Sequence, residues 1–353
     1  MKKRNNNIDF LRGIATLCII VIHTAFWTGE AYLPPWVTNL SLLIDVPVFM
    51  FISGISFSFI NSISKNIILL IKQWKKWLFF ILIYTLIILI FYNSQFSIKD
   101  FICWLVYYFP NNTSLTVVGG SIWFWVMYIK VTIICSIIIH TNNMLEKNKE
   151  KNIRNLIYIG LLTTLMFMYT SLSGLNEFIF DAKTLFFMII YILGYLSLNY
   201  KINLKQTLIY EFIAILITFI LFYSYKYTLA DLQTIKFSFS VVYLPFSLIS
   251  IILFWYLKDK LKIKDKNPIV YIGKNAIWFY FAQGISSSLL FYVYPYISNQ
   301  KDIVVFPIML IINVALATIM AIILEKSYNI IDKIEKNDKI IKVVKSLAPQ
   351  KIK

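Results

Sequence analysis

Long apolar runs separated by short polar segments recur along the whole chain. A helix needs about 20 mainly apolar residues to cross the hydrocarbon core of a bilayer, and a backbone in lipid must satisfy its own hydrogen bonds. The runs therefore predict an all-α fold, a polytopic membrane helical bundle with about ten transmembrane helices. The predicted spans are 10–28, 42–62, 77–93, 121–140, 155–172, 184–198, 207–224, 239–257, 269–291 and 303–325. The apolar segment 101–109 is too short to cross, and is predicted to lie in the interface or to re-enter from outside.

Basic residues lie mostly on one side of these spans. With the N-terminus inside, 26 of the 34 Lys and Arg residues fall in cytoplasmic segments, five in external segments and three within spans. Cytoplasmic loops of membrane proteins carry such an excess of positive charge, so both termini are predicted to be cytoplasmic. Residues 1–325 are predicted to form the membrane domain and residues 326–353 a basic cytoplasmic tail, either a solvated anchor or a surface helix.

Composition supports the membrane class. Hydrophobic residues make up 59% of the chain and charged residues only 14%, against roughly 25% charged residues in soluble domains. The net charge of +17 does not gather on one soluble face but lies between apolar runs, which indicates topology and contact with membrane lipids rather than nucleic acid. Cys18, Cys103 and Cys135 lack metal-binding spacing, so no metal site and no disulfide framework are predicted.

The first predicted span contains two ionisable side chains, Arg12 and His23. Eleven residues of α-helix turn through about 1100°, so the two side chains share one face, roughly 16 Å apart along the axis. Arg12 alone could be an anchor that reaches the interface, and His23 could be a neutral imidazole bonded to a neighbour. Together they predict a polar stripe through most of the membrane. His140 is expected at the interface, without chemistry.

Asp45 and Lys130 are two further charges at or within spans. Asp45 opens the second span at a depth similar to that of His23. Its carboxylate could hold the imidazole in one tautomer or simply favour the positive end of a helix dipole. Lys130 lies in the middle of the fourth span, where a lysine is expected to face a polar cavity or a partner carboxylate.

The remaining candidate cations lie on the predicted cytoplasmic side. Lys72, Lys75 and Lys76 precede the third span, and Lys274 follows a glycine at the start of the ninth. The first three could bind phosphates as point charges or only enforce the topology. Lys274 is close enough to the interface for its ammonium group to reach water.

Four segments together resemble the multi-pass acyltransferase type 3 family. IDFLRGIATLCIIVIH (8–23) is similar to the opening of that family, with its arginine and histidine separated by ten residues. IDVPVFMFISGISF (44–57), SIWFWVMYI (121–129) and YIGKNAIWFYFAQ (271–283) resemble the segments that follow, in the same order. Two departures stand out. Gln283 stands where the late segment often has histidine, and the basic loop carries lysines in place of the usual arginines.

The resemblance implies an O-acyltransferase that moves an acyl group, usually acetyl, from cytoplasmic acyl-CoA to a hydroxyl of a cell-surface glycan or glycolipid. Acetyl-CoA would then be the donor substrate, with no metal involved. In this interpretation His23 and Asp45 carry the catalysis. The polyanionic donor would be held by Arg12, Lys72, Lys75, Lys76, Lys130 and Lys274. His23 is either a general base on the acceptor hydroxyl or the carrier of a transient acyl-imidazole.

Two other functions fit parts of the pattern. A transporter or flippase for a glycan or lipid intermediate would use intramembrane Arg, His and Lys as a translocation path, usually with inverted repeats or broken helices. A purely structural envelope component would make no use of the polar stripe. The Asn-, Ile- and Lys-rich composition is associated with AT-rich bacterial genomes, so a bacterial cell membrane is the expected location. The acceptor and the oligomeric state are not readable from the sequence.

Overall fold

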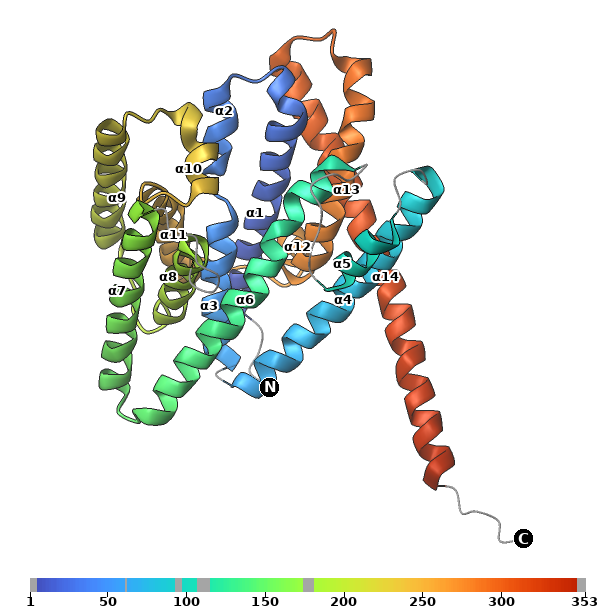
Figure 1. Cartoon of the computed structure of the whole chain (residues 1–353), viewed down its shortest axis with the longest axis horizontal. Coiled ribbons are helices and arrows are strands. Elements are labelled where there is room, and N and C mark those ends of the chain that lie inside the picture. Colours follow the sequence, from blue (N-terminus) through green and yellow to red (C-terminus); the bar gives the residue numbers. More distant parts are fainter. Residues whose placement is uncertain (1–4, 61, 93–96, 107–114, 174–180, 348–353) are drawn as a thin grey trace.

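The computed structural model describes residues 5–60, 62–92, 97–106, 115–173 and 181–347 (Figure 1). In these ranges the chain is an all-α bundle. The longer helices are α1 (Asn6–His23), α3 (Val46–Ile60), α4 (Ile63–Phe91), α6 (Thr116–Leu145), α7 (Lys149–Ser173), α8 (Ala182–Leu196), α9 (Leu204–Tyr225), α11 (Tyr243–Lys260), α13 (Ala276–Ile297) and α14 (Asp302–Leu347). Shorter helices are α2 (Pro35–Leu40), α5 (Ile98–Val106), α10 (Leu232–Ser238) and α12 (Pro268–Lys274), with single turns η1 (Thr24–Thr28), η2 (Gly29–Ala31), η3 (Ser41–Leu43) and η5 (Leu229–Asp231).

Eight of the described helical segments are long and apolar enough to cross a membrane, which confirms a polytopic membrane bundle. A ninth candidate is Leu229–Ser238 with Tyr243–Lys260, two helices bent by 99° at a short break. The sixth predicted span corresponds to α8, an apolar helix of 15 residues. Each of the ten predicted spans therefore has a helical counterpart, although α8 is shorter than a full crossing.

Three segments that are predicted to be cytoplasmic lie at one end of the bundle. The N-terminal end of α1 and the C-terminal end of α14 lie toward the same face, the lower one in Figure 1. The connection between α6 and α7, which carries Lys147, also lies on that face. Residues 326–347 of the predicted basic tail are helical, because α14 continues past residue 325 to Leu347. Of segment 101–109, residues 101–106 belong to α5, and the rest lies outside the described residues.

Two helix crossings depend on glycines. A Cβ at Gly13 would overlap the carbonyl oxygen of Ile269, and one at Gly273 would overlap that of Asp9, so α1 and α12 touch backbone to backbone. Gly54 and Gly194 do the same for α3 and α8. Close approach through small residues is a common way to pack helices in lipid. The first crossing brings the segment around Arg12 against the one that ends at Lys274.

Asparagines fix the start of α1 against the end of α11. Asn5 caps α1 by accepting from the backbone N–H of Asn7. The Asn7 amide donates to the carbonyl oxygens of Lys258 and Leu261, and its Oδ1 accepts from the backbone N–H of Ile263. These bonds hold the first turn of α1, and with it Arg12, in a fixed position at one end of the bundle.

Candidate functional site

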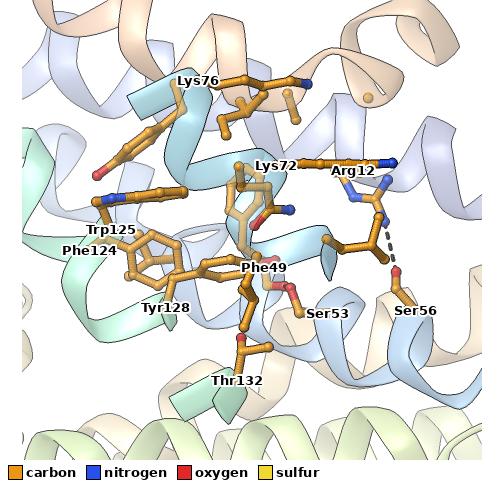
Figure 2. Close-up of a pocket in the computed structure, with 18 of the residues that line it drawn as sticks. Arg12, Phe49, Ser53, Ser56, Lys72, Lys76, Phe124, Trp125, Tyr128 and Thr132 are labelled. Atoms are coloured by element: carbon orange, nitrogen blue, oxygen red, sulfur yellow. Dashed lines mark hydrogen bonds between the residues drawn. The ribbon is translucent and has the colours of Figure 1, made fainter. Parts of the chain in front are cut away.

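A cavity of about 920 Å³ runs into the bundle between α1, α3, α4, α6 and α12. Its lining includes Arg12, His23, Asp45, Ser53, Ser56, Lys72, Lys75, Lys76, Trp123, Phe124, Trp125, Tyr128, Lys236, Lys274 and Tyr280. Figure 2 shows Arg12 and Lys72 extending to one side, and the rings of Phe49, Phe124, Trp125 and Tyr128 gathered on the other. The cavity thus has a cationic wall and an aromatic wall. A ligand with a charged part and an apolar part would meet a matching wall on each side.

Arg12 and His23 both line this cavity, so the predicted shared face of α1 is confirmed. The guanidinium of Arg12 donates to Asp9 Oδ1 at 2.9 Å and to Ser56 Oγ at 2.8 Å (Figure 2). Asp9 lies one turn before Arg12 on the same helix, and Ser56 lies on α3. These contacts hold the guanidinium in one position, and 22% of its side chain stays exposed for contact with a ligand.

The predicted donor-binding lysines meet at the mouth of the cavity, with one exception. Lys72, Lys75 and Lys76 of α4 and Lys274 of α12 all belong to the lining. The Lys76 ammonium lies 5.2 Å from the ring centre of Trp278, and Lys274 pairs with Asp265 at 3.2 Å. The residues of α14 at this mouth are Tyr328, Asn329 and Asp332.

Lys130 is the exception. It is not among the lining residues, and its Nζ lies 3.8 Å from Asp181 Oδ1, at the start of α8. Of the two surroundings predicted for Lys130, a polar cavity or a partner carboxylate, the structure has the carboxylate. Asp181 also caps α8 by accepting from the backbone N–H of Thr184. The geometry therefore separates Lys130 from the mouth lysines, and its predicted role in donor binding stays a prediction.

Asp45 lines the cavity, but its carboxylate is engaged by other groups than the imidazole. Lys236 Nζ lies 2.6 Å from Asp45 Oδ2, and the Tyr243 hydroxyl donates to the same oxygen at 3.1 Å. Both charges of the pair are almost fully buried. Asp45 also directly precedes α3, and its carbonyl accepts from the backbone N–H of Val48. Of the two roles predicted for Asp45, the structure shows the position at the start of α3. The carboxylate forms an ion pair with Lys236, within electrostatic reach of the imidazole.

His23 ends α1, is partly buried and belongs to the cavity lining. Its Nδ1 has no hydrogen-bond partner among the described residues, and neither does the side-chain oxygen of Gln283. Gln283 lies within side-chain hydrogen-bonding reach of His23, and Lys236 and Asp45 lie within electrostatic reach. Gln283 thus stands beside the imidazole at the position where the resembling family often has histidine. The imidazole thus lines the cavity while its unpartnered Nδ1 is buried, and a positioned histidine of this kind can serve as a general base.

The helix changes type immediately after His23. Residues Thr24–Thr28 form a π-helical turn, a feature often found at functional sites. Thr24 accepts from the amide of Asn313 on α14 at 2.9 Å, and that amide also donates to Ser287, while Ser286 donates to the Asn313 oxygen at 2.6 Å. All members of this network are buried. A satisfied polar network of this kind fixes the position of the helix segment that carries His23.

Sequence reasoning missed Lys236, Tyr243 and Asn313. Lys236 is one of the five basic residues in predicted external segments, and it lies on α10, which packs against α11 across the 99° bend. Asn313 lies in an apolar run, where a single amide carries only a weak signal. Within the described residues no group of three or more His, Cys, Asp or Glu side chains could hold a metal ion.

The fold and the cavity define a polytopic membrane protein with a histidine in the lining of its cavity and lysines at the mouth. A family model described as an acyltransferase domain matches residues 5–322, nearly the whole chain. The chain therefore belongs to the acyltransferase type 3 family and is a multi-pass membrane acyltransferase. No curated protein and no solved structure gives a significant match.

Proposed function

We propose that the protein is an O-acyltransferase of a bacterial cell membrane. It moves an acyl group, preferably acetyl, from cytoplasmic acyl-CoA to a hydroxyl of a cell-surface glycan or glycolipid. The observation that carries this proposal is the single cavity lined by Arg12 and the mouth lysines as well as by His23. One molecule bound in it could place its phosphates among the cations and its thioester beside the imidazole.

The donor is held from the mouth inward. The phosphates of CoA meet Lys72, Lys75, Lys76 and Lys274 as point charges, and the fixed guanidinium of Arg12 offers paired donors further in. The pantetheine arm then lies along the face of α1 between Arg12 and His23, a distance of roughly 16 Å on the helix axis. The rings of Phe49, Phe124 and Tyr128 line its other side.

The chemistry takes place at His23. The acceptor oxygen attacks the thioester carbonyl carbon while an imidazole nitrogen removes the hydroxyl proton. The tetrahedral intermediate collapses by breaking the C–S bond, and the imidazolium returns the proton to the leaving CoA sulfur. The products are the acyl ester and free CoA. An acyl-imidazole formed by direct attack of His23 on the thioester gives the same products in two steps.

Transfer from one side of the membrane to the other is the property to test. Right-side-out and inside-out membrane vesicles are prepared separately. Each preparation receives radiolabelled acetyl-CoA either inside or outside, and the label in lipid-linked glycan is counted. The proposal expects label only when the donor faces the side of the α6–α7 connection. Equal labelling from both sides, or no labelling with intact protein, contradicts it. A vesicle preparation containing His23→Gln protein gives the background.

A further inference from the structure

Three lysines without a role in the proposed donor site lie near one another. Lys183 lies over the ring of Trp123, and Lys130 and Lys236 lie within electrostatic reach of Lys183. Lys236 pairs with Asp45, and Lys130 lies at a longer distance from Asp181. Lys183 lies within electrostatic reach of both other lysines and of Asp181. It has no salt bridge within the described residues, and its ammonium is instead held 4.0 Å from the ring centre of Trp123. This cluster, here called the Trp123 cluster, consists of Trp123, Lys130, Lys183 and Lys236.

The charges of the Trp123 cluster do not balance. In the described part of the chain, three ammonium groups face two carboxylates, those of Asp45 and Asp181. Like charges repel strongly where the surroundings are poor in water, and ionisable groups in a membrane protein are rare unless they serve a purpose. A ring face attracts a cation, but it does not neutralise it. One further anionic group would balance the charges of the described residues.

The Trp123 cluster stands between the cavity and the surface. Trp123 lines the cavity that contains His23. Phe237 packs edge-on against it with ring centres 5.9 Å apart, and 49% of Phe237 is exposed. Lys130 and Asp181 are each about one-third exposed at their side chains. An acceptor approaching His23 from this side would pass the lysines and the indole before its hydroxyl reached the imidazole.

We propose that the Trp123 cluster is an acceptor subsite for an anionic glycan, with a carboxylate or phosphate bound by Lys183 and a sugar ring held at Trp123. This inference rests on the proposed function, since it identifies the substrate class of the same cavity. The anion and the acylated hydroxyl belong to one molecule. Lys236, already bound to Asp45, forms the border between the acceptor subsite and His23. Lys130 orients Asp181, and both lie beside the bound anion.

The test compares acceptors that differ in charge. Purified protein in lipid nanodiscs receives radiolabelled acetyl-CoA and envelope glycans from cells that lack the protein. The glycans are separated by anion exchange into a neutral and an anionic fraction. We expect label in the anionic fraction. Carbodiimide-assisted reduction, which converts carboxylates to alcohols, then identifies the source of the charge. Loss of acceptor activity indicates a carboxylate, and retained activity indicates a phosphate.

Variants separate a binding role from a structural one. Lys183→Gln is expected to raise the KM for the anionic fraction about tenfold, as the loss of one charge-assisted contact would do, with the KM for acetyl-CoA unchanged. Lys183→Arg should restore most of the affinity. Lys301→Gln makes the same charge change at an exposed position before α14 and should have no effect. A merely structural lysine would instead lower kcat with every acceptor.

Three outcomes would contradict the proposed acceptor subsite. Equal labelling of the neutral and anionic fractions overturns the anionic subsite and leaves the acyltransferase proposal standing. A Lys183→Gln protein with unchanged KM for the anionic fraction also overturns it. No label in either fraction, from protein that binds acetyl-CoA, overturns the proposed glycan acceptor and this inference with it.

Discussion

The two ends of the cavity use their lysines in different ways. At the mouth, Lys72 and Lys75 lie on the exposed face of α4, and Lys274 is paired with the exposed Asp265. At the deep end, Lys236 is buried, bound to Asp45 at 2.6 Å and close to Tyr243. Exposed cations remain hydrated and exchange partners easily, whereas a buried cation needs a fixed partner. The mouth is thus suited to capturing a polyanion, and the deep end to keeping a reaction centre in one arrangement.

The largest effect on the rate of acyl transfer is expected from replacing His23 at the deep end. His23→Ala should lower acyl transfer by about 10² to 10⁴-fold, since a positioned base contributes that much. His140→Ala removes the only other histidine, near the C-terminal end of α6, and should leave the rate unchanged. Radiolabel transfer at equal protein amounts measures both variants. Normal transfer by His23→Ala protein would contradict a reaction centre at the deep end.

Breaking the buried pair should have the next largest effect. Lys236→Met leaves the Asp45 carboxylate buried without its cation, which costs about 3–5 kcal/mol. The double variant Lys236→Met with Asp45→Asn removes both charges and should recover most of that stability. Thermal unfolding in detergent compares these proteins with Lys72→Met, for which no shift is expected. Equal stability of Lys236→Met and Lys72→Met would mean that the two ends do not differ as described.

A smaller loss of stability is expected at the crossing of α1 and α12, which depends on Gly273. Gly273→Ala forces α12 away from the Asp9 carbonyl, and overpacking of this kind costs about 1–3 kcal/mol. Gly160→Ala on α7 is the control, because its added methyl would lie 3.7 Å from the nearest atom, on Ile192. That variant should be neutral, or stabilised by about 0.5–1 kcal/mol. Unfolding temperatures that fall equally for both would contradict a tight α1–α12 contact.

The mouth lysines should show the smallest effect for each residue. Lys72→Gln and Lys75→Gln are each expected to raise the KM for acetyl-CoA a few-fold, because an exposed ion pair is worth about 0.2–1 kcal/mol. The effect should shrink as salt increases from 0.05 to about 0.5 M, where screening shortens the range of the charges. Initial rates at several donor concentrations measure it. A rise in KM that is independent of salt would speak against binding by point charges.

The helices could be predicted because lipid makes length and hydrophobicity decisive. Each of the ten apolar runs has a helical counterpart in the structure. The fixed rotation per residue of an α-helix places Arg12 and His23 on one face. The partner of Asp45 could not be predicted in this way. It comes from α10, almost 200 residues later, and only the 99° bend brings Lys236 to the cavity. Local patterns define single helices, but contacts across the bundle depend on how loops direct short helices.

The central claim is that one path leads from the cationic mouth to His23. Bromoacetyl-CoA tests it most directly, because its reactive carbon takes the place of the acyl group and an imidazole nitrogen displaces its bromide. Peptide mapping by mass spectrometry after brief exposure should find the modification on His23, and excess CoA should prevent it. Modification of Lys72, Lys75 or Lys76 alone, with His23 untouched in protein that still transfers acetyl groups, would contradict the account.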